Sequence, residues 1–154
     1  MDQLEAKSLI EAGTRANFAG NALVLIVPSD SKLDLRAFSE LTKAKKIAVG
    51  DPKTVPAGSY ARDLLESTNL WTKLAPQMVF GENVRQVLDY VSRGEVDAGI
   101  VYATDAQVAG SKVAVAAKAP EAAVRPILYP IARVKRSSHS EAAKLCSRRR
   151  GPRF

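Results

Sequence analysis

The sequence predicts an α/β fold built on a mostly parallel sheet, because strand-like and helix-like segments alternate along it. Short apolar runs typical of strands are followed by segments whose apolar residues recur at helical spacing. Turn residues separate these segments by short loops, and no segment is repeated. In such sheets ligands bind beyond the carboxyl ends of strands, so a site is expected in the loops there.

The first predicted strand is Ala22–Val27, an apolar run that ends at Pro28 and is typical of a buried strand. A short helix is predicted over Leu33–Leu41. The second strand, Lys46–Val49, is closed by Gly50. These segments open a lobe that is expected to cover residues 24–110.

The next predicted helix begins at Pro56 or Ala57 and runs to about Thr68. Proline suits a first helical turn, because its missing N–H would have had no partner there. A helical turn over Leu70–Leu74 and a strand over Gln77–Phe80 follow.

Asn83 is a suitable N-cap for a strong amphipathic helix, which Gly94 ends. The strand Asp97–Tyr102 comes next. The remaining predicted elements are a short helix Thr104–Val108, a strand Lys112–Ala116, a strand Ile127–Val134 and the start of a helix at His139–Leu145.

The net charge of +7 does not predict a nucleic-acid partner, because it is confined to one end of the chain. Residues 133–154 hold eight of the 23 basic residues and only one of the 16 acidic residues, so the rest is neutral. A groove for nucleic acid needs basic residues across a folded face. The Arg-rich end is interpreted as a solvated, disordered tail.

Enzymatic and metal-binding functions are not indicated. The single histidine, His139, lies in a polar stretch, and Cys146 has neither a second cysteine nor a histidine partner. No phosphate-binding or dinucleotide-binding glycine motif is present. Asp51 and Asp105 are expected near the sheet edge, where they are interpreted as orienting loop backbone. We therefore expect a non-enzyme without a cofactor.

Two predicted helix starts and one strand end could hold an anion. A buried anion needs N–H donors, and helix N-termini supply free amides and a partial positive charge. Ala57 and Val84 stand at helix starts, Gly58 would let the first turn approach a ligand, and Tyr102 could donate its hydroxyl. Asn83 supports the second start as its cap. The alternatives stay open at this point: a plain helix start, a core valine and a packing tyrosine.

Five motifs between Phe18 and Asp105 stand in a specific order. They are Phe18–Pro28 (FAGNALVLIVP), Gly50–Pro52 (GDP), Val55–Ala61 (VPAGSYA), Gly81–Arg85 (GENVR) and Gly99–Asp105 (GIVYATD). Together they resemble the periplasmic molybdate-binding proteins of ABC importers. The resemblance implies a type II periplasmic-binding-protein fold whose two lobes close on molybdate or tungstate through neutral hydrogen bonds.

The resemblance also implies roles for single residues. Ala57 and Val84 would give backbone N–H donors and Tyr102 its hydroxyl, with Gly58 and Asn83 in support. Molybdenum would be present only as the bound oxyanion. A permease in the membrane would receive it, and the periplasm would be the location. The motifs do not distinguish molybdate from tungstate or sulfate.

Both ends of the chain differ from the pattern of the family it resembles. The family's signal peptide, the first strands of its other lobe and two Ser-bearing turns would precede Met1, and residues 147–154 do not continue its closing helix. We therefore expect residues 1–23 to be a hinge-proximal segment of an incomplete lobe. Residues 111–154 are expected to hold the return crossing, a partial second lobe and the basic tail.

An internal start and a frameshifted or truncated end would explain these differences. The expected consequences are weak or undetectable molybdate binding, retention in the cytoplasm without another export route, and a possible dimer through the incomplete lobe. Two other functions are considered. One is the effector-sensing domain of a transcription regulator, which would need a helix-turn-helix that is not found. The other is a fragment without ligand function.

Overall fold

The computed structural model describes residues 1–149, which form two compact units. Among these residues, unit 1 consists of Met1–Gly20 and the stretch from Ile127 onward, and unit 2 is the continuous stretch Asn21–Pro126. Within the described residues, no helix is long and apolar enough to cross a membrane. The last five residues of the predicted basic tail lie outside the described part.

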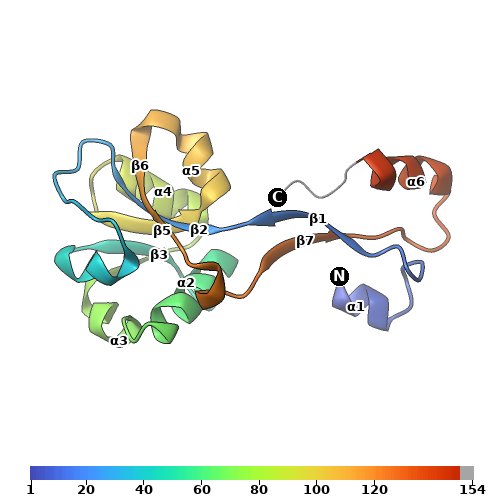
Figure 1. Ribbon diagram of the computed structural model, residues 1–154, viewed down its shortest axis with the longest axis horizontal. Coiled ribbons are helices and arrows are strands. Elements are labelled where there is room, and N and C mark those ends of the chain that lie inside the picture. The colour runs from blue at the N-terminus through green and yellow to red at the C-terminus, as the bar shows by residue number, and fades with distance from the viewer. Residues whose placement is uncertain (150–154) are drawn as a thin grey trace. The chain divides into compact units, whose positions relative to one another are not determined.

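Unit 2 is built on a five-stranded sheet in the order β4-β3-β5-β2-β6 (Figure 1). Its strands are β2 (Leu23–Pro28), β3 (Ile47–Gly50), β4 (Met78–Gly81), β5 (Ala98–Tyr102) and β6 (Val113–Lys118). Strand β3 pairs in parallel with β4 and β5, whereas β2 is antiparallel to both β5 and β6. The expectation of a mostly parallel sheet therefore holds for four strands that share one direction, and β2 is reversed among them.

Helices cover both faces of this sheet, with α4 and α5 on one side and α2 and α3 on the other (Figure 1). The helices are α2 (Pro56–Ser67), α3 (Trp71–Leu74), α4 (Val84–Ser92) and α5 (Ala103–Ala109). Short 3-10 helices lie in the connections of this unit: η1 (Phe38–Lys43), η2 (Ala75–Gln77), η3 (Gly110–Lys112) and η4 (Glu121–Ala123). This two-sided cover explains why β2 is one continuous apolar run.

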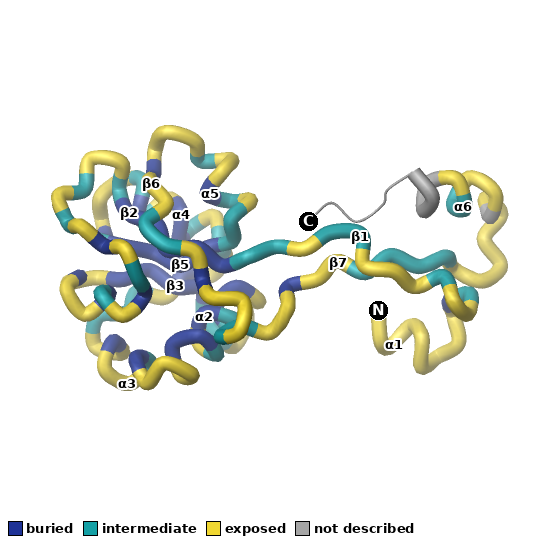
Figure 2. The backbone as a smooth tube through the Cα atoms, viewed as in Figure 1, coloured by how far each residue is buried: buried dark blue, intermediate teal, exposed yellow. Residues whose placement is uncertain are grey.

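The core lies on both faces of the sheet. On the α4 side, Val24 and Ile26 of β2 pack with Val87 and Val91 of α4. The intervening residue, Leu25, points to the opposite face and is also fully buried. Figure 2 shows this burial concentrated in the strands and the inward faces of the helices of unit 2.

The prediction of a helix over Leu33–Leu41 was wrong. The chain is irregular up to Ala37 and then forms η1, a 3-10 helix. Phe38 and Leu41 are three residues apart and both buried, which a three-residue period allows. The Arg36 N–H donates to the carboxylate of Glu40 at 2.7 Å, so the chain enters η1 from an extended segment.

Unit 2 reaches further than the expected lobe of residues 24–110, because β6 pairs with β2 and extends the sheet to Lys118. Unit 1 contains α1 (Asp2–Ala6), β1 (Ala16–Asn21), β7 (Ile127–Ile131) and α6 (Ser140–Arg149). Strands β1 and β7 form a two-stranded sheet, and β7 is shorter than predicted. The Glu11 N–H donates to the Arg133 carbonyl at 2.9 Å and joins the segments next to it.

Candidate functional site at the carboxyl edge of the sheet

Three neighbouring strands end at the same edge of the sheet in unit 2. Strands β4, β3 and β5 are adjacent and parallel, and Gly50 lies opposite Gly81 in the register. Each of the three strands is followed at this edge by a helix start: α2 after β3, α4 after β4 and α5 after β5. The structure therefore brings Ala57, Val84 and Tyr102 to one edge of one sheet.

The first turn of α2 leaves one N–H group directed out of the helix. Gly58 and Ser59 both donate to the Val55 carbonyl, at 2.9 and 3.1 Å, and Pro56 has no N–H. Ala57 is buried, with 1% of the residue exposed. Because a helix supplies no acceptor for its first N–H groups, the contribution that Ala57 can make to a ligand is its backbone N–H.

The glycine after Ala57 has a packing role that the sequence did not predict. A Cβ on Gly58 would stand 2.0 Å from the Gly50 oxygen and 2.5 Å from the Gly50 carbonyl carbon. Gly58 is therefore required for α2 to pack directly against the end of β3. The expectation that Gly58 lets the first turn of α2 approach a ligand stays a prediction beside this packing role.

The loop between β3 and α2 is held by Asp51. Its carboxylate accepts the Lys53 N–H at 2.9 Å, and its own N–H donates to the Gly81 carbonyl at 2.9 Å. Its carbonyl accepts the N–H of Val55 at 2.8 Å. Asp51 orients loop backbone, as the sequence predicted, and ties the approach to α2 to the end of β4.

Helix α4 begins with a side-chain cap that leaves its first N–H groups uncapped. The Asn83 carbonyl oxygen of the side chain accepts the Gln86 N–H at 2.9 Å, and the Gln86 side chain accepts the Glu82 N–H at 2.7 Å. The predicted N-cap is thus confirmed. The cap takes the third N–H of α4 and not that of Val84, whose half-buried side chain packs against the core. Val84 has a core side chain and a backbone donor at the helix start.

Tyr102 is the last residue of β5 and the N-cap of α5. Alternation along the strand places its half-buried side chain on the face opposite Val101. The chain enters unit 2 beside it: the Ala103 N–H donates to the Ala22 carbonyl at 2.8 Å, and the Asn21 amide donates to the Thr104 hydroxyl at 3.0 Å. The start of β2 is therefore fastened to the start of α5, which sequence spacing alone did not predict.

Asp105, in the first turn of α5, is a carboxyl group at this edge with a raised pKa. Burial raises the pKa, and it is opposed by the charge of Arg85 and by a hydrogen bond from the backbone of Tyr102. The bond to Tyr102 shows that Asp105 also orients backbone, as predicted. The edge thus holds the starts of α2, α4 and α5, with Arg85 and Asp105 beside them.

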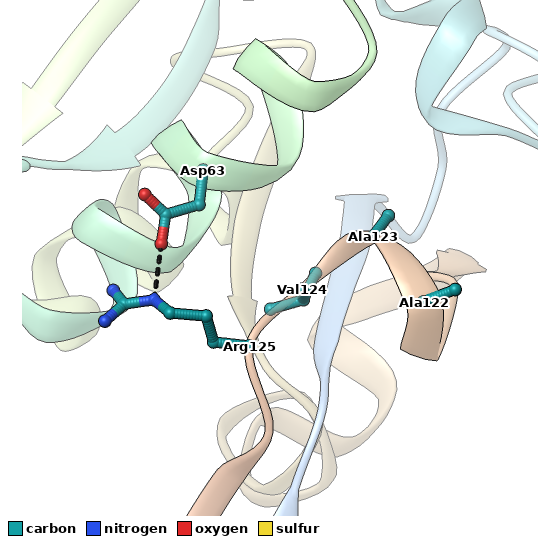
Figure 3. Close-up of a pocket in the computed structure, with 5 residues that line it drawn as sticks. All are labelled: Asp63, Ala122, Ala123, Val124 and Arg125. Atoms are coloured by element: carbon teal, nitrogen blue, oxygen red, sulfur yellow. Dashed lines mark hydrogen bonds and ion pairs between the residues drawn. The ribbon is translucent and has the colours of Figure 1, made fainter.

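A second feature of unit 2 was missed by sequence reasoning. A shallow hollow is lined by Asp63 of α2 and by residues 122–125, and Arg125 pairs there with Asp63 at 2.8 Å (Figure 3). The two residues stand 62 positions apart, and no motif connects them. Among the residues that the structure describes, no cluster of three or more potential metal ligands occurs.

Comparison with known proteins assigns this chain to a family. The sequence model described as bacterial extracellular solute-binding protein matches residues 1–145. YvgL of Bacillus subtilis (strain 168), provisionally named as an ABC transporter substrate-binding lipoprotein, is 41% identical over 143 residues, covering 90% of this chain and 55% of its own. The molybdate-binding protein ModA of Escherichia coli (strain K12) is 35% identical over 158 residues, covering 99% of this chain and 61% of its own.

Solved structures agree. The substrate-binding domain of a provisionally assigned molybdenum ABC transporter from Clostridium difficile superposes with a TM-score of 0.89 at 38% identity, over 96% of this chain and 64% of that one. The periplasmic molybdate-binding protein of Azotobacter vinelandii gives a TM-score of 0.73 at 20% identity, covering 98% and 68%, which supports the fold alone. These structures confirm the periplasmic-binding-protein-like fold.

The chain spans about 55–61% of the length of these two sequence relatives. The relatives are named as binding proteins of transporters, in line with the expected non-enzyme. The family match covers nearly the whole chain, residues 1–145. The chain therefore belongs to the bacterial extracellular solute-binding protein family.

Proposed function

We propose that this chain carries the oxyanion-binding edge of the substrate-binding component of an ABC importer, with molybdate or tungstate as the ligand. One observation carries the proposal: three parallel strands deliver two helix starts and Tyr102 to one edge. The relatives named as molybdate-binding proteins support the choice of ligand.

The chemistry suits a fully deprotonated tetrahedral anion. The N–H groups of Ala57 and Val84 would each donate to an oxygen, aided by the positive ends of α2 and α4. The Tyr102 hydroxyl would add a third donor. An anion that still carries a proton would find no acceptor for that proton among these donors, so binding favours the dianion.

The ligand would then pass to a permease in the membrane. The relatives include YvgL, provisionally named as a lipoprotein, so we place the function outside the cytoplasmic membrane. Nothing in the fold or in the comparisons favours an effector-sensing domain of a transcription regulator.

The test is a titration of the ¹⁵N-labelled chain with sodium molybdate, followed by NMR of its amides, with sodium sulfate as the control anion. We expect saturable shifts centred on Ala57 and Val84 with molybdate. Weak binding would still support the proposal, since NMR titration detects dissociation constants in the millimolar range. Equal shifts with both anions, or no saturable shift at these two amides, would contradict the proposal.

A further inference from the structure

Arg125 joins two parts of unit 2 that are distant in sequence. Its guanidinium pairs with the Asp63 carboxylate at 2.8 Å, and it donates to the Ser59 hydroxyl at 3.4 Å. It also lies over the Tyr60 ring, 5.0 Å from the centroid. The three partners lie in the first two turns of α2, so one side chain holds this part of the helix. Figure 3 shows its ion pair with Asp63.

The segment that carries Arg125 is the last stretch of chain in unit 2. It begins at Ala119, whose N–H donates to the Leu23 carbonyl at 2.9 Å, and it ends at Pro126. Between these ends lies η4, in which the Ala123 N–H donates to the Pro120 carbonyl at 3.0 Å. The segment is thus held to β2 at one end and to α2 by Arg125 at the other.

We propose that Arg125 is a positioning residue: it fastens the exit segment Ala119–Pro126 onto the first two turns of α2 and so couples that segment to the anion site at the start of the same helix. The anion half of this statement rests on the proposed function. The residues gripped by Arg125 stand two to six positions after Ala57, within the same turns that an anion would order.

The coupling follows from shared ordering. A bound anion restricts the first turn of α2, and the grip of Arg125 restricts Ser59, Tyr60 and Asp63 in the same turns. The bound anion reduces the conformational freedom that the Arg125 contacts must remove, and the Arg125 contacts do the same for the anion. Each interaction therefore strengthens the other. By thermodynamic linkage, the factor by which the anion stabilises the Arg125 contacts equals the factor by which those contacts raise the affinity for the anion.

Arg62 is a matched control on the same helix. It pairs with Glu66 at 2.7 Å and lies over the Trp71 ring at 5.5 Å, so it also combines an ion pair with a ring contact. Its partners are not in the exit segment. Arg62→Ala therefore removes the same kinds of interaction from α2 without releasing that segment.

The experiment measures amide hydrogen exchange of Ala123 and Ala119 in the wild-type chain, Arg125→Ala, Arg125→Lys and Arg62→Ala, with and without sodium molybdate. We expect Arg125→Ala to speed Ala123 exchange about three- to tenfold, the loss expected for one exposed ion pair with a stacked ring. Ala119 exchange should stay unchanged, because its bond to β2 remains. Arg125→Lys should be intermediate, since lysine keeps the charge and loses the planar fork.

Molybdate provides the second readout. It should slow Ala123 exchange in the wild-type chain and in Arg62→Ala, and the Kd for molybdate should rise in Arg125→Ala by the same factor. Unchanged Ala123 exchange in Arg125→Ala, or an equal effect of Arg62→Ala, would overturn the role of Arg125. If the wild-type chain binds no molybdate, the proposed function and the coupling fail together, while apo exchange still decides whether Arg125 holds the segment.

Discussion

Gly58 illustrates what sequence reasoning reached at the scale of single residues and what it did not. The motif around it predicted the helix start correctly but did not predict the backbone contact that requires the glycine. The close contact with the backbone of Gly50 is long-range packing, which no local pattern encodes. Ala57 and Val84, in contrast, were placed correctly at helix starts, because proline and the N-cap asparagine are local signals.

Gly58→Ala should therefore destabilise unit 2. The added Cβ would overlap the Gly50 oxygen, and backbone on both sides prevents an easy shift. We expect the free energy of unfolding to fall by about 1–3 kcal/mol, as in other overpacked cores. Urea denaturation measures it, with Arg62→Ala on the exposed face of the same helix as the control. An unchanged midpoint would show that α2 can move away from β3.

Tyr102→Phe tests the hydroxyl donor with little change in packing. Loss of a hydrogen bond to a charged group should weaken molybdate binding by about 1.5–3 kcal/mol, or roughly tenfold to a hundredfold. The titration described above gives the affinity. Tyr90→Phe, on α4 and packed against the core cluster, is the matched control. Equal affinities of the Tyr102→Phe variant and the wild-type chain would remove Tyr102 from the site.

Asp105→Asn tests the raised pKa. A folded-state pKa above the ordinary value means that the fold binds the proton more tightly, so stability is lost as the pH rises from that ordinary value through the folded one. Asparagine keeps an oxygen to accept the Tyr102 N–H and carries no charge. The variant should gain stability relative to the wild-type chain across this window and hold the gain at neutral pH. Thermal unfolding between pH 3 and 7 measures the difference, and a constant difference would contradict the prediction.

At the scale of elements, most strands and helices of unit 2 could be predicted from the sequence. Each has a local signal, because its residues are either amphipathic in pattern or uniformly apolar. The order of strands could not, since pairing depends on contacts far apart in sequence. The reversed direction of β2 is such a case: a buried strand has the same composition in either direction. Strand β1 was missed as well, because its residues are exposed or half-buried and show no clear alternation.

The start of α4 allows cap and site to be separated. Asn83→Ala should cost about 1 kcal/mol of stability, because the Gln86 N–H loses its acceptor. Asn83→Asp keeps the acceptor and adds a negative charge near the proposed ligand. It should leave stability nearly unchanged and weaken molybdate binding. Unfolding and titration are measured on both variants; unaltered affinity in Asn83→Asp would place the anion away from α4.

At the scale of the whole molecule, the two units differ in how they are stabilised. Within the described residues, unit 1 holds two buried large hydrophobic side chains, Ile10 and Ile127, and seven of the ten exposed ones. The exposed ones in unit 1 are Met1, Leu4, Leu9, Leu128, Tyr129, Val134 and Leu145. A two-stranded sheet with so little burial is marginal by itself. Its boundaries escaped prediction, because they depend on pairing between the two ends of the chain.

Native-state hydrogen exchange should show this difference directly. We expect the amides of Glu11 and Lys135, which bridge the two ends in unit 1, to exchange through low-energy openings. Amides in the centre of β2 and β5 should exchange only at the free energy of global unfolding of unit 2. Similar protection in both units would mean that unit 1 has support beyond the burial described.

The reversal of β2 has a consequence for engineering. Because β2 starts where β5 ends, and β6 runs back alongside it to Ala119, the two covalent connections of unit 2 both lie at the ligand edge. The opposite edge, reached by the exposed Ser29 and Asp30 after β2, carries neither connection nor candidate donor. A reporter domain inserted at Ser29 and Asp30 should therefore leave ligand binding unchanged and give no signal on binding. One inserted within Ala119–Pro126 should change its signal when the ligand binds.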